Sequence, residues 1–172
     1  MLRASTGKWV FRFEGAYVAT ENPSGKDRTK EPSSLHAVLG AERPFGERVR
    51  AQTQLIARWH PEWYRPDSAS LSPVDRGIAG ANAVLFDYTS RVRPASTLRV
   101  AFDTEDERYA SELFVLVDWV AGDGVVRPTM TWRVSDALRF MTGAETFFGP
   151  RRSPLGAFTR YSGVFVGARY SF

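Results

Sequence analysis

The stretch "GVFVGARYSF", residues 163–172, shows the sequence pattern from which the fold can be predicted. Successive side chains of an extended strand point to opposite faces, and this stretch alternates large apolar residues with small or polar ones. Val164, Val166 and Tyr170 fall on one face, and Arg169 and the glycines fall on the other. A soluble sheet with one buried face gives the same pattern. The other segments must therefore decide between a soluble and a membrane-embedded sheet.

The same alternation recurs along the chain. It is found in residues 8–20, 34–42, 48–60, 98–103, 111–120, 126–134 and 138–148. Together with the terminal segment, this pattern predicts about eight strands and an all-β fold. No run of about 18 apolar residues is present, so a transmembrane helix is not predicted and any membrane crossing would use strands.

The two faces of these strands differ in chemistry. One face carries repeated charges at Arg12, Glu14, Glu42, Arg50, Arg58, Arg99, Asp103, Glu112, Asp118, Arg127, Arg133, Arg139, Glu145 and Arg169. The other face carries aromatic residues near the strand ends, at Trp9, Trp59, Trp119, Trp132, Phe148, Tyr170 and Phe172. Charged lumens and interfacial aromatic girdles are typical of membrane barrels. We therefore interpret the chain as an antiparallel up-and-down transmembrane β-barrel, with the first set facing the lumen and the second at the membrane interfaces.

A soluble sandwich or a lipocalin-like fold is the alternative to the barrel, because both also have alternating strands. Pro128 is the one discordant residue, since a proline on a strand removes a donor from the hydrogen-bonded ladder. The connections favour the barrel. Tight turns are expected at residues 43–47, 104–108 and 134–137, and they alternate with the connections 21–34, 61–95, 121–124 and 149–158. Outer-membrane barrels have tight turns on the periplasmic side, which predicts an even number of strands with both termini on that side.

The very long connection contains a predicted short helix. Ser72 is a suitable N-cap, Pro73 suits the first helical position, and Asp75 lies in the first turn. Apolar residues then follow at helical spacing, at Val74, Ile78, Ala81 and Leu85. Two interpretations stay open: a short surface helix in one long external loop, or a constriction or lid at the barrel mouth.

The C-terminal part of the chain resembles a known family. Residues 126–172 contain an "RP" dipeptide, an "SD" turn, a glycine before an "FFG" loop entry and a final "YSF". The positions concerned are Arg127, Pro128, Ser135, Asp136, Gly143, Phe147, Phe148, Gly149, Tyr170, Ser171 and Phe172. These motifs resemble the last strands of porin-like proteobacterial outer-membrane β-barrels of uncharacterised function, and residues 9–17 and 38–54 look like upstream strands of the same family.

The resemblance implies a single outer-membrane β-barrel domain over residues 1–172, in the outer membrane of a Gram-negative bacterium. It also implies that the terminal strand is read by the barrel assembly machinery. Family members are typically longer, so the chain can also be interpreted as the C-terminal part of a larger or split barrel. A partner barrel chain or an envelope complex would then complete the ring, and outer-membrane lipid and lipopolysaccharide would surround it.

Catalytic, metal and nucleic-acid sites are not predicted. The chain has no cysteine and two histidines, and neither His36 nor His60 has the HExxH spacing of a zinc site. Gly77 and Gly80 lack the spacing of a phosphate loop, and no serine lies in a GxSxG motif. We therefore predict no catalytic residue, no metal and no cofactor. The net charge of +4 comes from arginines spread along the chain, which argues against a nucleic-acid partner.

Three functions stay open. The first is a porin-like channel or a transport or export component, in which surplus lumen arginines favour anionic or polar solutes. The second is a small barrel plugged by paired charges, which serves as a structural or docking protein through its external loops. The third is a barrel enzyme that modifies lipids with a Ser, His and acid triad at its rim.

Overall fold

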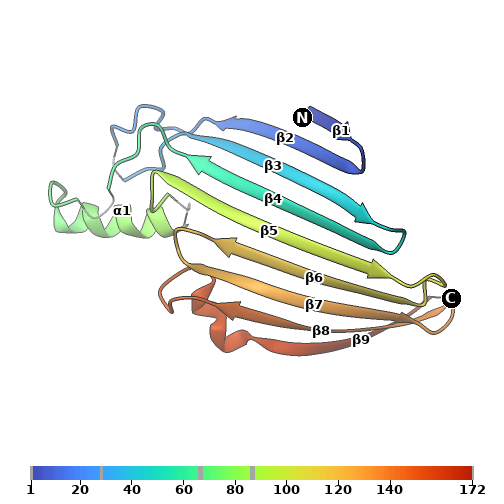
Figure 1. The fold of residues 1–172 in the computed structure, drawn as a ribbon. Helices are drawn as coiled ribbons and strands as arrows, with labels where there is room; N and C mark the ends of the chain where they lie inside the picture. The colour runs from blue at the N-terminus through green and yellow to red at the C-terminus, as the bar shows by residue number, and fades with distance from the viewer. Residues whose placement is uncertain (1, 28, 66–67, 86–87, 172) are drawn as a thin grey trace.

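A computed structural model describes residues 2–27, 29–65, 68–85 and 88–171. They form one antiparallel sheet of nine strands that follow one another in chain order (Figure 1). The strands are β1 Leu2–Thr6, β2 Trp9–Val18, β3 Ser34–Phe45, β4 Val49–Trp59, β5 Val92–Asp103, β6 Tyr109–Asp118, β7 Asp123–Arg133, β8 Leu138–Phe148 and β9 Gly163–Tyr170. Two helical elements interrupt the connections, the helix α1 Pro73–Leu85 and the 3₁₀ helix η1 Gly156–Tyr161.

The all-β, up-and-down architecture is confirmed, and each predicted strand is present. The predicted number of strands was wrong, because β1 adds a ninth and makes the count odd. β1 pairs with Trp9–Phe13 of β2 through a tight turn in which Gly7 has a φ of +56°. β5 is also longer than predicted, since it begins at Val92 rather than at Leu98.

The register gathers one predominantly apolar row after another on one face, while the other face carries the charged residues together with some apolar ones. Residues directly opposite each other share a face of a sheet. One such row runs Phe11, Ala41, Thr53, Leu98, Val115 and Val126 from β2 to β7. We call this side the apolar face and the other side the polar face. Pro128 lies on the apolar face of β7, and the ladder between β7 and β8 is interrupted at Arg127 and Pro128 without a change of register.

The sheet forms a single curved layer (Figure 1). Among the described residues, the buried apolar side chains are only Ala79, Ala83, Tyr88 and Val125, and the first three lie in or close to α1. The apolar face is uncovered: Met130 is 46% exposed and Val166 on β9 is 79% exposed. Domains normally bury such a face against a second layer. This sheet therefore has an extensive apolar surface without a protein core behind it.

Each edge strand has one neighbour. In the described part of the chain β1 pairs with β2 and β9 pairs with β8, and no pairing joins β1 to β9. The two strands lie at opposite edges of the layer (Figure 1). The sheet is thus open.

The connections fall into two groups, as the sequence predicts. Residues 7–8, 46–48, 104–108 and 134–137 make the short turns at one end of the sheet, which we call the tight-turn end. Residues 19–33, 60–91, 119–122 and 149–162 join the strands at the other end, which we call the long-loop end. No helix in the described residues has the length and apolar character needed to span a membrane.

The predicted helix is confirmed as α1, at the long-loop end. The Ser72 hydroxyl accepts the backbone N–H of Asp75 at 3.1 Å and donates to its carboxylate at 2.7 Å, which caps the first turn. Ala79 and Ala83 are buried. The predicted apolar positions instead face outwards, with Val74 70% exposed and Ile78 and Leu85 also exposed. The helix packs along no strand of the sheet in the described residues, so it belongs to the loops.

Candidate functional site

The predicted lumen residues all lie on the polar face. Every second residue of a strand lies on the same face, so the row of Arg12, Gly40, Gln54 and Thr97 shows which residues of each strand belong to the polar face. Every predicted lumen residue from Arg12 to Arg169 is one of them. The structure therefore brings these charges, which are far apart in the sequence, onto one continuous surface.

Ion pairs join neighbouring strands across the centre of the polar face. Arg12 on β2 and Arg50 on β4 both contact Glu42 on β3, at 2.9 and 3.7 Å. Arg99 contacts Glu112 across β5 and β6 at 2.7 Å. Such half-exposed pairs each contribute little to stability, about 0–1 kcal/mol. Their effect is to neutralise the central arginines in part and to fix their side chains along the surface.

A further pair, between Arg127 on β7 and Glu145 on β8, is longer at 4.0 Å. The Arg127 guanidinium also lies over the Phe114 ring, 5.5 Å from its centroid. A cation over an aromatic face is attracted by the ring quadrupole. Arg127 is thus held by both neighbouring strands.

The polar face is hollowed in two places. The larger hollow has a volume of about 350 Å³ and is lined by residues of β3 to β7, among them Arg50, Gln52, Arg99, Glu112 and Thr131. The smaller one, about 120 Å³, lies over β2 to β4 and is lined by Arg12, Glu14, Glu42, Gln52 and Gln54 among others. Polar side chains in a concave surface suit water and polar solutes.

Aromatic residues border the apolar face at both ends. Trp9, Trp132 and Tyr170 lie at the tight-turn end, and Trp59 and Phe148 lie at the long-loop end. Trp119 lies one residue beyond the end of β6 at Asp118, and its backbone N–H donates to the Pro94 carbonyl of β5 at 3.1 Å. Phe172 lies outside the described residues.

Three contacts organise the aromatic border at the tight-turn end. The Trp132 ring lies 6.1 Å from that of Tyr109 on β6. Arg43 lies on the apolar face of β3. Its guanidinium is 5.1 Å from the Trp9 ring centroid and 4.9 Å from that of Phe45. Long cationic side chains take such positions where an apolar surface ends and a polar medium begins.

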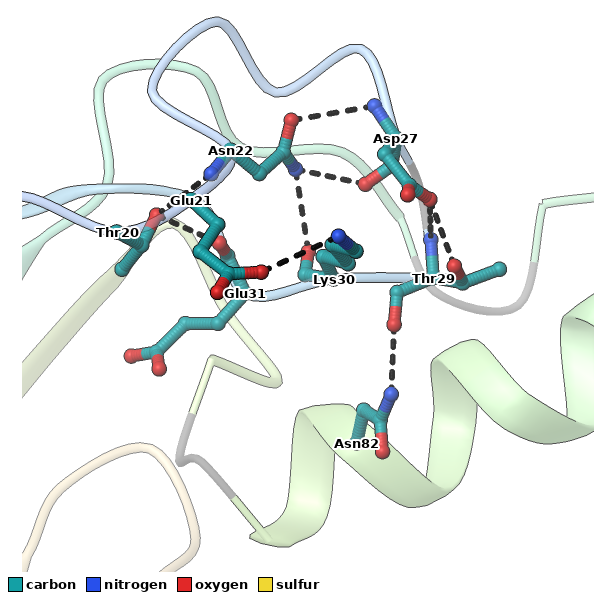
Figure 2. A network of polar contacts seen from close by, with 8 residues as sticks. All are labelled: Thr20, Glu21, Asn22, Asp27, Thr29, Lys30, Glu31 and Asn82. Carbon is teal, nitrogen blue, oxygen red and sulfur yellow. Dashed lines mark hydrogen bonds and ion pairs between the residues drawn. The ribbon is translucent and has the colours of Figure 1, made fainter.

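The loop of residues 19–33 is held by Asn22 (Figure 2). Asn22 is 5% exposed, and its Nδ2 donates to the carbonyls of Asp27 and Lys30 at 2.7 and 3.3 Å. Its Oδ1 accepts the N–H of Asp27 at 3.2 Å. Asn82 of α1 donates from Nδ2 to the Thr29 carbonyl at 2.6 Å, so the helix is tied to this loop.

The connection of residues 60–91 interlocks with the same loop. The Tyr64 hydroxyl donates to the Lys30 carbonyl at 2.6 Å, and Trp63 Nε1 donates to the Tyr88 carbonyl at 2.9 Å. Gly25, with a φ of +62°, lies so close to Glu62 that a Cβ would overlap its backbone. We call the described residues of 19–33 and 60–91 the loop layer. It is an ordered structure of its own at the long-loop end.

A second loop is anchored by Asp123, the first residue of β7. Asp123 is buried, and its Oδ2 accepts the N–H groups of Leu155 and Gly156 at 2.7 and 3.3 Å. Nearby, Arg93 on β5 forms a buried ion pair with Asp118 at the end of β6. These contacts fix the polar rim of the sheet beneath the loops.

A serine and a histidine meet at the rim without forming a triad. Ser34 Oγ lies 2.9 Å from His36 Nε2. Ser34 is fully buried, and no carboxylate among the described residues hydrogen-bonds to His36. Nor do the described residues contain a group of His, Asp and Glu side chains that could hold a metal ion.

His60 should make the loop layer sensitive to pH. The side chain is fully buried beside Tyr88, and this burial, followed by the charge of Arg58, lowers the pKa of His60. Unfolding or opening the layer restores a pKa of about 6.5. The open state therefore binds the proton more tightly, so stability is full above about pH 6.5 and falls as the pH drops towards the folded pKa.

We expect amide exchange in residues 60–65 and 88–91 to accelerate relative to intrinsic rates as the pH falls from about 7.5 to 5.5. A His60→Phe variant should lose this pH dependence, and a His36→Phe variant should keep it. An unchanged pH dependence in His60→Phe would contradict the assignment to His60.

Sequence reasoning missed Arg93, Asp123 and Asn22. Arg93 lies on the same face of β5 as Arg99, so a prediction that began this strand earlier would have included Arg93 among the residues of the polar face. Asp123 and Asn22 have no comparable local signal, because their partners are backbone groups of folded loops.

Compared with protein-family models, curated proteins and solved structures, the chain gives no match in any of the three.

Proposed function

We propose that this protein is an outer-membrane β-barrel of a Gram-negative envelope, and that it acts as a porin-like channel or transport component. The observation that carries the proposal is the uncovered apolar face bordered by aromatic residues at both strand ends. A lipid bilayer is the environment in which such a face is stable without a second protein layer. The aliphatic centre of the face would contact acyl chains, and the tryptophans and tyrosines would lie at the headgroups.

The polar face supports a role in solute passage. In a closed ring this hollowed face would line the interior. Glu42, Glu112 and Glu145 pair with four central arginines, which leaves a polar surface with fixed charges and a surplus of positive charge. Fixed charges and hydrogen-bonding groups along a pore select solutes by charge and size.

A docking protein is the second candidate, and the loop layer supports it. Hydrogen bonds from Asn22, Asn82 and Tyr64 hold two connections in one defined arrangement. Loops that only link neighbouring strands do not need such a network. The same layer presents the exposed apolar side of α1, with Val74 and Ile78. In this case the barrel interior would be filled by paired charges, and the external loops would bind a partner in the envelope.

Planar-bilayer recording separates the two candidates. We expect the purified, refolded full chain to produce discrete conductance steps with a preference for anions over cations. Arg50→Glu should reduce this preference, because Arg50 lines the larger hollow of the polar face. Thr53→Ser is the matched control on the same strand, since Thr53 lies on the apolar face.

Insertion of the chain into the bilayer without conductance would contradict the channel and favour the docking protein. Insertion is read independently from heat-modifiable migration on a gel. A chain that never inserts would contradict both candidates.

A further inference from the structure

The polar face ends in three neighbouring arginines at the tight-turn end of β7, β8 and β9. Arg133 lies directly opposite Arg139, and Arg139 lies directly opposite Arg169. We call these three residues the arginine row. Side chains directly opposite each other in an antiparallel sheet have Cβ atoms about 4.5–5.5 Å apart. The register thus places three arginine side chains next to one another on one face.

The arginine row has fewer carboxylate partners than the centre of the polar face. Arg133 contacts Glu107 at 3.4 Å, but Glu107 belongs to the turn before β6 and is 75% exposed. Among the described residues, Arg139 and Arg169 have no carboxylate within ion-pair distance. Like charges directly opposite each other are destabilising. An anion bound between them would relieve this repulsion.

The surface beside the arginine row has space for a small ligand. The next row of the polar face towards the sheet centre is formed by Thr131, Met141 and Gly167. A Cβ on Gly167 would meet only the Met141 Cε, at 4.0 Å, so Gly167 leaves room beside Arg169. Thr131 lines the larger hollow and brings a hydroxyl donor to the same area.

We infer that the arginine row is a binding site for a doubly charged oxoanion, a phosphate or the phosphate group of a soluble phosphomonoester. A guanidinium presents paired N–H donors that match two oxygens of a phosphate, and neighbouring arginines bind it from two sides. The row lies on the face opposite the apolar one, so the ligand reaches it from water. This inference deepens the proposed function and rests on it for the claim that the polar face is open to solutes.

The test is a titration of inorganic phosphate into the purified full chain in a non-ionic detergent at pH 7.5, followed by calorimetry. We expect saturable binding at one site. Arg139→Gln and Arg169→Gln should each weaken binding about tenfold, because each removes charged hydrogen bonds to the anion. Arg139→Lys should retain part of the affinity, since it keeps the charge but loses the paired donors.

Arg76→Gln is the matched control. Arg76 is an exposed arginine of α1, at the long-loop end of the sheet, and its loss changes the net charge equally without touching the row. The affinity of this variant for phosphate should stay within about twofold, because charges at opposite ends of the strands are screened from each other by salt. Equal weakening by Arg76→Gln and Arg139→Gln would show unspecific attraction and overturn the site, as would the absence of saturable binding.

Further outcomes distinguish a soluble phosphate from a lipid headgroup, and failure of the arginine row from failure of the proposed function. Row-dependent binding to phosphatidylglycerol vesicles without binding of inorganic phosphate would overturn the soluble ligand in favour of a lipid headgroup. Phosphate binding by a chain that never inserts into bilayers contradicts the proposed function alone. Conductance without phosphate binding contradicts the arginine row alone.

Discussion

Replacing Val115 by arginine should destabilise the membrane-inserted protein by about 2–4 kcal/mol, the cost of a cation on the lipid face of a membrane barrel near the midplane. Val115 lies between Leu98 and Val126 in the aliphatic part of the apolar face. An arginine there must either desolvate its charge in hydrocarbon or extend its side chain to a distant headgroup. The measurement is denaturant unfolding of the protein in lipid vesicles.

Thr129→Arg is the matched control for Val115→Arg. Thr129 lies on the neighbouring strand β7, but on the polar face and at the wall of the larger hollow. A charge there stays in contact with water, so we expect a change within about 0.5 kcal/mol, as for ordinary surface substitutions. If the apolar face were in water, Val115→Arg would also fall within this range. Equal stability of the two variants would therefore rule out a lipid-facing surface.

The strands could be predicted from sequence because their signal is local. A period of two in residues such as Phe11 and Phe13 against Arg12 is visible without knowing which strand lies next to it. The helix α1 was predictable for the same reason, since Ser72 and Asp75 form the cap within four residues of chain. The alternation of tight and long connections follows from the strand positions alone.

Other features depend on contacts between distant residues and could not be predicted. β1 has only five residues, and it becomes a strand because the edge of β2 is available for pairing. Pro94 interrupts the alternating pattern, so the sequence did not predict that β5 begins at Val92. Val74 is exposed because α1 buries its other side, at Ala79 and Ala83, and this side is determined by contacts with the loops.

The arginine row illustrates the same limit on the polar face. The sequence predicts that Arg133, Arg139 and Arg169 share a face, because the alternation of apolar and polar residues within each strand shows which face each residue belongs to. That they lie directly opposite one another depends on the registers of β7, β8 and β9, which are set by the lengths of turns and loops. A single-residue shift of either register would have separated them and moved their neighbours to the other face.

Closure of the sheet has the largest expected effect on assembly. In hydrocarbon each unpaired backbone group costs several kcal/mol, so neither edge can stay open in a bilayer. β1 and β9 are both odd-numbered in an antiparallel series and run in the same direction, whereas β2 and β9 run in opposite directions. β1 covers only Trp9–Phe13 of β2. Displacement of this short strand would leave eight strands, which can close with antiparallel pairs throughout.

We therefore expect β2 and β9 to pair within one chain in the membrane. The test is a set of double-cysteine variants with one cysteine at Phe13 and the other at Val164, Val166 or Ala168, which covers three registers on the apolar face. After refolding into vesicles and mild oxidation, one of the three pairs should form a disulfide within a single chain. Disulfides form only when the Cα atoms lie about 4.4–6.8 Å apart, so capture reports direct strand pairing.

A variant with cysteines at Phe13 and Val115 is the control and should form no disulfide, because three strands separate β2 from β6. Crosslinks that join only different chains would contradict self-closure, and they would mean that β9 takes up a strand from another polypeptide. Such a ring would be wider, and the arginines of its polar face would surround water rather than one another. The same three cysteine pairs thus decide both how the edges are satisfied and whether the polar face has room to conduct.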